Sequence, residues 1–249
     1  MTATETNGAG VGPERPQFQT THWSVVLGAR GADEELAGRA LGRLCQTYWY
    51  PLYVFIRRQG QSAEDAQDLV QGFFAKALEK NYFNEAVQEK GKFRSFLLLA
   101  LKRYMANEWD RANCLKRGGG CETIPLDPAE TETRYRAEAI DDLNPEKAYD
   151  RRWAETLLEQ VLRTLQAEYA AAGKARAFEK LQVCLSGEKS DQSHAELGRE
   201  LGMTEGALRV AVHRLRQRYR ELLRSEIAQT VASPVLVDEE IRQLFAALA

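Results

Sequence analysis

Residues 193–223 read SHAELGRELGMTEGALRVAVHRLRQRYRELL, which is the pattern of two helices joined by a tight turn. Ser193 and Glu196 form a capping box, which predicts the start of the first helix. Gly202 lies where this helix must end in a left-handed conformation, which glycine adopts freely because it has no Cβ. Thr204 is the predicted N-cap of the second helix. The stretch therefore predicts a helix-turn-helix.

The second helix of this pair combines one apolar face with many arginines. We expect its buried face to consist of Leu208, Val212, Leu215, Tyr219, Leu222 and Leu223. Gly198 supplies the small residue that the crossing of the two helices requires. The outward faces suit a DNA major groove and its phosphates, and they carry Glu205, Arg209, His213, Arg216 and Arg220. The same apolar pattern fits an αα-hairpin in a bundle, but the density of arginines favours DNA binding.

Charge is distributed unevenly along the chain, although the net charge of all 249 residues is only −2. Residues 92–118 contain seven basic and two acidic residues, and residues 208–224 contain six arginines and one glutamate, so each segment carries +5. Residues 121–150 between them contain three basic and nine acidic residues, a charge of −6. Either basic segment alone is also typical of a solvated helix face, but the two together, around an acidic spacer, favour a nucleic-acid partner.

Composition and patterning exclude several classes of protein. The chain has no uninterrupted apolar run of about 18 residues, which excludes a membrane span. Residues 1–16 lack the apolar core of a secretory signal. The four cysteines contain no C-x-x-C pair, which argues against a disulfide framework or a Cys-rich zinc site and suits the reducing cytoplasm. Because the chain has only three histidines and no enzyme motif, we expect no catalytic activity, no metal and no cofactor.

Apolar residues recur at helical spacing along most of the chain, and no segment shows the alternation of a strand. In the front half they predict one helix that Pro51 kinks or breaks, a second that starts at Ser62, and a third around residues 93–104. Turn residues and few large apolar side chains mark residues 118–150 as a linker that is flexible in part. Helices resume at Trp153. We therefore predict an all-α fold of two helical domains joined by an acidic linker.

Three segments of the chain follow the pattern of a known family. They are YPLYVFIRR at 50–58 with SAEDAQDLVQGFF at 62–74, KFRSFL at 92–97, and ELGRELGMTEGALR at 196–209 with HRLR at 213–216. Their order resembles that of the extracytoplasmic-function (ECF) sigma factors of bacterial RNA polymerase. In this family a helical sigma domain 2 precedes a linker and a helix-turn-helix sigma domain 4. The resemblance covers residues 40–117 and 153–224.

The resemblance implies how the chain is divided and what it binds. The parts are an N-terminal extension at 1–35, sigma domain 2 at 36–118, the acidic linker at 119–150, sigma domain 4 at 151–228 and a C-terminal tail at 229–249. Such a protein binds core RNA polymerase, at the clamp helices of the largest subunit and at the flap region, and directs transcription from promoter DNA. An anti-sigma factor, the linker and the tail are all open as regulators. The amphipathic tail either docks within the chain or recruits a partner.

The resemblance also implies which residues make these contacts. An Asp-Leu-Val-Gln core grips polymerase, which assigns this role to Asp68 and Gln71, with Gln67 and Phe74 beside them. The basic end of the third helix captures the downstream promoter element through Lys102, Arg103, Trp109 and Arg111. The helix-turn-helix reads the upstream element through Thr204, Glu205, Arg209, His213, Arg214 and Arg216. Tyr104 continues the apolar stripe of the third helix, so we expect it in the core.

Two other functions fit parts of the pattern. A helix-turn-helix regulator would bind DNA without binding polymerase directly. An all-α, Mg²⁺-dependent nucleotide pyrophosphohydrolase would use carboxylates at helical spacing, here Glu64, Asp65, Asp68 and Glu79. However, Gln71 and Gly72 stand where a second acidic pair is needed. The chain also departs from the sigma family at Arg103 and Phe96, where Asn and Trp are common, so the promoter sequence and the efficiency of melting stay open.

Overall fold

The computed structural model describes residues 34–78, 92–114, 128–137, 144–185, 194–231 and 233–249. Every regular element in these ranges is a helix, and one isolated antiparallel bridge joins Lys92 to Val231. The all-α prediction is therefore confirmed. The N-terminal extension expected at 1–35 lies almost entirely outside the described ranges, and so does the predicted capping residue Ser193.

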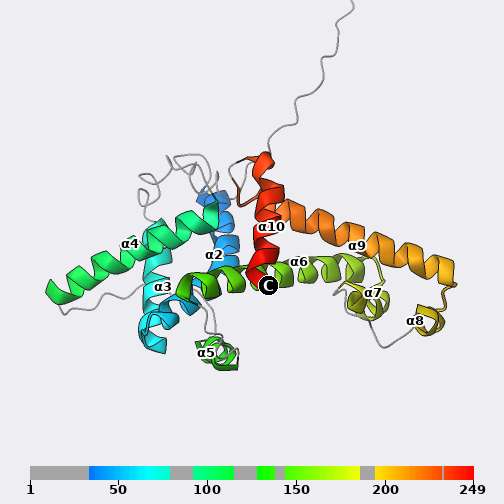
Figure 1. The fold of residues 1–249 in the computed structure, drawn as a ribbon, viewed down its shortest axis with the longest axis horizontal. Helices are drawn as coiled ribbons and strands as arrows, with labels where there is room; N and C mark the ends of the chain where they lie inside the picture. Colours follow the sequence, from blue (N-terminus) through cyan, green and yellow to red (C-terminus); the bar gives the residue numbers. More distant parts are fainter. Residues whose placement is uncertain (1–33, 79–91, 115–127, 138–143, 186–193, 232) are drawn as a thin grey trace, which may run out of the picture.

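The helices have the following bounds. In chain order they are α2 (Glu34–Arg58), α3 (Ala63–Leu78), α4 (Phe93–Cys114), α5 (Pro128–Ala137), α6 (Pro145–Ala171), α7 (Ala175–Leu181), the 3₁₀ turn η1 (Gln182–Cys184), α8 (His194–Leu201), α9 (Glu205–Ala228), the 3₁₀ turn η2 (Pro234–Leu236) and α10 (Val237–Leu248). Figure 1 shows α2, α3 and α4 at one end of the molecule and α7 and α8 at the other. Helix α6 runs between these two regions, and α9 runs from beside α8 to α10 near the middle of the molecule (Figure 1).

Helix α2 supplies much of the apolar core and continues through Pro51. A proline inside a helix removes one backbone donor and favours a kink or a break. Tyr48, Leu52 and Phe55, which flank it, are all fully buried, and their packing against other helices holds the segment in place. The break that the sequence allowed at Pro51 is therefore absent.

The larger of two hydrophobic cores combines helices from far apart in the chain. Its buried side chains come from α2, α3, α4, the first half of α6, the end of α9 and α10, and they include Tyr48, Phe73, Phe93, Trp153, Ile227 and Leu244. The rings of Tyr48 and Phe93 meet edge to face, with centroids 5.1 Å apart. Burial of a large apolar side chain stabilises a fold by about 1.5–3 kcal/mol. This core therefore ties the front helices to the C-terminal helix.

A smaller core lies at the other end, between the second half of α6, α7, α8 and the first half of α9. It consists of Leu165, Phe178, Leu181, Leu197, Leu208, Val212 and Leu215. Helices α6 and α9 contribute side chains to both cores. Helix α6 has 27 residues, which makes it about 40 Å long at 1.5 Å per residue. The two cores are therefore joined by continuous helices and not by a loop alone.

The segment 119–150, which we expected to be a linker, differs from the structure in two places. Helix α5 lies within it, and α6 begins inside it at Pro145. The side chain of Asn144 caps α6 by accepting a backbone N–H at 2.8 Å, and proline is favoured at the first helical position. Tyr149, one turn further on, is fully buried. Capping and burial together start α6 earlier than its apolar stripe indicates.

Helix α5 is held against α2 by an acidic residue of the expected linker. The carboxylate of Glu132 accepts a hydrogen bond from the Tyr53 hydroxyl and pairs with Arg57 at 3.0 Å. Burial alone would raise the pKa of Glu132, but the hydrogen bonds from Tyr53 and Arg57 lower it below its ordinary value. The guanidinium of Arg134 lies 4.3 Å from the centre of the Tyr50 ring. Charged residues of this segment therefore form contacts that hold α5 against α2.

The C-terminal tail docks within the chain. Helix α10 packs against α6 and α9, with Val237, Glu240 and Leu244 buried. Of the two roles that the sequence left open for the tail, intramolecular docking is the one observed.

Candidate functional site

Helices α8 and α9 form the turn geometry that the sequence predicts. Gly202 has a φ of +64°, so the left-handed conformation expected at the end of α8 is confirmed. A Cβ added at Gly198 would lie 3.1 Å from the Met203 carbonyl oxygen, so a small residue is needed there. The Thr204 hydroxyl accepts a hydrogen bond from the backbone N–H of Ala207 at 3.3 Å, which confirms the N-cap of α9. Helices α8 and α9 are therefore joined by the tight turn that the sequence predicts.

The faces of α9 also follow the prediction. Leu208, Val212, Leu215 and Leu223 are buried, and Tyr219 and Leu222 are half-buried. All six residues assigned to the upstream element are exposed, namely Thr204, Glu205, Arg209, His213, Arg214 and Arg216. Arg209 pairs with Glu205 one turn earlier on the same helix. His213, Arg214 and Arg220 are exposed to solvent on the same helix.

Several arginines of α9 are engaged within the fold. Arg216 donates from two nitrogens to the carbonyl oxygen of Cys184, at 2.7 and 2.9 Å, and so holds the end of η1 against α9. Arg218 pairs with Glu168 of α6 at 2.6 Å, and this hydrogen bond lowers the pKa of Glu168. Arg224 pairs with Asp238 of α10. The charge of +5 counted over 208–224 therefore overstates the charge available to a ligand.

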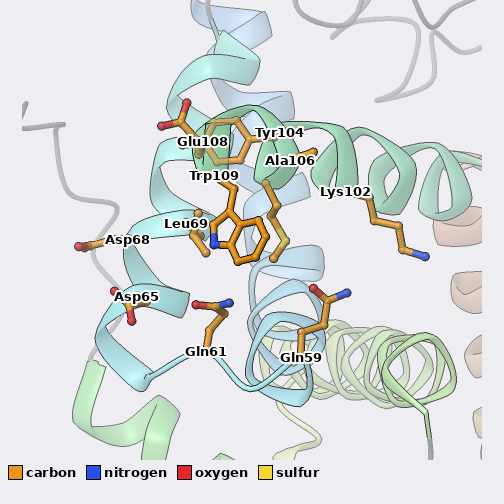
Figure 2. Close-up of a pocket in the computed structure, with 11 residues that line it drawn as sticks. Gln59, Gln61, Asp65, Asp68, Leu69, Lys102, Tyr104, Ala106, Glu108 and Trp109 are labelled. Carbon is orange, nitrogen blue, oxygen red and sulfur yellow. The ribbon is translucent and has the colours of Figure 1, made fainter. Parts of the chain in front are cut away.

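Helix α3 presents a polar face with Asp68 on its outside. The helix begins after Ser62, whose hydroxyl accepts a hydrogen bond from the backbone N–H of Asp65 at 3.0 Å, as predicted. Asp68 is exposed, and Gln67 and Gln71 are half-buried beside it. The carboxylate of Asp68 points outward from α3 in Figure 2. The expected exposure of this position is confirmed.

Phe74 is the exception among the residues assigned to polymerase. Its side chain is 1% exposed, and its ring packs against Phe73 with centroids 5.6 Å apart. It continues the apolar stripe of α3 into the larger core, so it is unavailable to a partner in this structure. The burial of Phe74 therefore does not favour its assignment to a polymerase contact.

An open cavity of about 730 Å³ lies between the end of α2, the start of α3 and the second half of α4. Figure 2 shows the indole of Trp109 extending from α4 toward Gln61, and this side chain is 73% exposed. The lining residues are Gln59, Gln61, Asp65, Asp68, Leu69, Lys102, Tyr104, Met105, Ala106, Glu108 and Trp109. The cavity therefore offers one exposed ring, amide groups and charges of both signs.

Three residues that line the cavity were not predicted from the sequence, namely Gln59, Gln61 and Glu108. The two glutamines belong to the turn between α2 and α3, and they meet Trp109 only through the packing of three helices. The spacing of Lys102, Met105, Ala106 and Trp109 at i, i+3, i+4 and i+7 was an available signal, since such residues share one face of a helix.

The four downstream-element residues differ in their surroundings. The Lys102 ammonium pairs with Glu146 of α6 at 2.7 Å, and this hydrogen bond lowers the pKa of Glu146. Arg103 and Trp109 are exposed. The side chain of Arg111 lies outside the described residues. Tyr104 is 7% exposed and packs against Phe73, so its expected place in the core is confirmed.

Two further properties concern the described residues only. In these ranges no group of three or more His, Cys, Asp and Glu side chains is arranged to hold a metal ion. Glu79, one of the carboxylates weighed for a magnesium site, is outside them. No helix in the described ranges has the length and apolar character to cross a membrane.

Comparisons with known proteins identify no relative of this chain. No family model matches it, and no curated protein or solved structure matches it either. Roles for its residues therefore have to be inferred from the sequence pattern and from the geometry of the helices.

Proposed function

We propose that this chain is a sigma factor of the ECF kind, which binds core RNA polymerase through α3 and promoter DNA through α4 and α9. One observation carries the proposal: exposed Asp68 on α3 and exposed Trp109 on α4 border the same cavity, in a chain whose other end carries a helix-turn-helix. A helix-turn-helix by itself would account only for DNA binding. The additional polar face and the exposed indole are what a polymerase-bound, promoter-melting protein uses.

The polymerase contact is assigned to Asp68 and Gln71. The two residues are three positions apart on α3, so they lie on one face of the helix. A carboxylate and an amide there are suited to the cations and polar groups of a partner helix. The resemblance to ECF sigma factors implies that this partner is the clamp helices of the largest polymerase subunit.

The cavity beside Trp109 is suited to a base of a melted DNA strand. Stacking of a base on an aromatic side chain is worth about 1–3 kcal/mol. The amides of Gln59 and Gln61 offer donors and acceptors to the edge of such a base. Arg103 is exposed on the same helix and is suited to a phosphate of that strand.

The upstream element is assigned to the first turns of α9. In a helix-turn-helix the N-terminal residues of the second helix contact base edges in the major groove. Arg209, His213 and Arg214 are exposed in this part of α9. Arg216, which bonds to the Cys184 carbonyl, acts mainly by fixing η1 against the helix.

The test is binding to core RNA polymerase in the absence of DNA. Charge reversal in Asp68→Lys should abolish this binding and leave the fold intact, because the side chain is exposed. Glu179→Lys is the matched control, since Glu179 is an exposed carboxylate on α7, far from α3 in Figure 1. Equal binding by the Asp68→Lys variant and the control would refute the assignment.

The same experiment decides between the sigma factor and a regulator that acts without polymerase. The geometry of α8 and α9 by itself supports the regulator as well. A wild-type chain that binds duplex DNA but retains no polymerase subunit would establish the regulator instead.

A further inference from the structure

Helix α10 lies between the start of α4 and the end of α9 (Figure 1). The chain leaving α9 is also tied to the chain entering α4. The backbone N–H of Phe93 donates to the Thr230 carbonyl oxygen at 3.0 Å, and Lys92 pairs with Val231 in an antiparallel bridge. Segments about 140 positions apart are thus joined by a backbone hydrogen bond just after α9 ends and before η2 and α10 begin.

A buried ion pair closes this junction. Arg94 of α4 is 8% exposed, Glu240 of α10 is 1% exposed, and Nε of the arginine lies 2.6 Å from the glutamate Oε1. Arg94 also pairs with Asp150 of α6, and its guanidinium lies 4.7 Å from the centre of the Trp153 ring. One cation therefore connects α4, α6 and α10 at a single point.

The electrostatics of this junction keep the guanidinium of Arg94 charged. Burial alone would lower the pKa of Arg94, but the carboxylates of Asp150 and Glu240 raise it above its ordinary value. Breaking a buried pair by removal of one partner is strongly unfavourable, because the other charge stays buried without compensation. The buried ion pair between Arg94 and Glu240 therefore opposes the separation of α10 from α4, in addition to the apolar packing.

The first turn of α10 is held from two sides. Lys92, before α4, pairs with Glu239 at 2.9 Å and with Glu240 at 3.1 Å. Arg224, near the end of α9, pairs with Asp238. Three consecutive acidic residues of α10 thus contact cations of the two basic segments of the chain.

We infer that α10 is an intramolecular clasp that holds α9 in one orientation relative to α4, and that Glu240 is the residue that positions it. The clasp itself does not depend on the proposed function. Its consequence does: a sigma factor whose two DNA-binding helices are held at one separation would accept promoters with a narrow range of spacer lengths. Release of α10 would widen that range.

The clasp is tested by the distance between two spin labels in the full chain. Labels attached through unnatural amino acids at Asn107 of α4 and Gln217 of α9, both exposed, report the separation of the two helices without using the native cysteines. The wild-type chain should give one narrow distance population. Glu240→Lys, which places a cation beside Arg94, should lose that population and give a broad distribution, and so should a chain that ends at residue 233.

Two control variants distinguish a change in the orientation of α9 from unfolding of the chain. Phe245→Ser changes the exposed face of α10, where the side chain is 55% exposed, and should keep the narrow population. Glu240→Gln removes the charge with little change of shape and should give an intermediate width. Hydrogen exchange should show that α2, α3 and the first half of α9 stay protected in each variant.

Several results would overturn the inference. These are a broad distribution in the wild type, a narrow one in Glu240→Lys, and a loss of protection throughout the chain, which would make α10 a part of the fold with no separate effect on orientation. Transcription by core polymerase from promoters with graded spacers then tests the consequence. Should polymerase not bind the chain at all, the proposed function fails while the distance measurement still decides the clasp.

Discussion

Helices α4 and α9 belong to the two basic segments of the chain, and they use their cations differently. At the start of α4, Arg94 is buried and pairs with Glu240, and Lys102 further along pairs with a carboxylate of α6. On α9, Arg209 and Arg214 are exposed on a helix whose opposite face fills the smaller core. Equal charge counts therefore conceal a difference in burial: Arg94 of α4 is buried, whereas the arginines of α9 are exposed, including those that pair within the fold.

The largest effect is expected from Arg94→Met. This change leaves Glu240 and Asp150 without their shared cation, and the loss of one partner from a buried pair costs about 3–5 kcal/mol. The free energy of unfolding in urea measures this loss. Arg103→Met, which removes an exposed cation of the same helix, should stay within about 0.5 kcal/mol of the wild type. Similar free energies of unfolding for the two variants would mean that the buried ion pairs of Arg94 do not stabilise the fold.

The next effect concerns DNA binding by α9. Arg209→Ala should weaken binding to an upstream promoter duplex by about 1–3 kcal/mol if the side chain reads a base, with little change in the free energy of unfolding. Arg176→Ala, which removes an exposed cation from α7, is the matched control. Fluorescence anisotropy with a labelled duplex gives both affinities. An equal, small loss in the two variants would point to general attraction by charge.

A smaller effect is expected at the start of α9. Thr204→Ala removes the N-cap hydrogen bond to the backbone of Ala207, and such caps contribute about 1 kcal/mol. Thr204→Ser keeps the hydroxyl and should restore most of this stability. Urea unfolding, together with hydrogen exchange in the first turn of α9, distinguishes the variants. A serine variant as unstable as the alanine variant would exclude the cap as the cause.

The smallest effect is expected from the ion pair between Lys102 and Glu146, because the two side chains are 40% and 46% exposed and solvent screens them. The hydrogen bond from Lys102 lowers the pKa of Glu146 below its ordinary value of 4.5. The stabilisation is therefore present above pH 4.5 and is lost as the pH falls through the lower pKa of the folded state.

The measurement is the free energy of unfolding of the wild type and of Lys102→Met between pH 7 and pH 3. The difference should stay below about 1 kcal/mol at pH 7 and disappear at the acid end. A difference that does not change with pH would show that Lys102 acts through the packing of its stem on Phe55, whose ring centre is 5.4 Å from the ammonium.

Features that depend on near neighbours could be predicted from the sequence. Ser62, Gly202 and Thr204 each act on residues within one helical turn, and each has the predicted conformation or hydrogen bond. The buried face of α9 follows from periodicity alone. At Phe74, the apolar stripe of α3 predicts a buried side chain and the family resemblance predicts a polymerase contact. The side chain is buried, as the stripe predicts.

Features that depend on distant partners could not be predicted. Arg94 and Glu240 are 146 positions apart, and neither segment has a pattern that indicates the other. The cavity likewise combines a turn after α2 with the second half of α4, and its shape depends on how the helices pack. The length of α6 was underestimated, because Ala148 and Tyr149 are the only buried residues in its first eight positions, too few to form an apolar stripe in the sequence.

The composition of the larger core has a consequence for how the protein is made. The helices from Tyr48 to Tyr104 leave the ribosome well before Leu244, which completes their packing. At 5–20 residues per second, translation of the roughly 140 residues between them takes about 7–28 seconds. Through that interval the nascent chain exposes aromatic surface that the finished protein buries, so α2 and α4 are the segments on which a chaperone is expected to act.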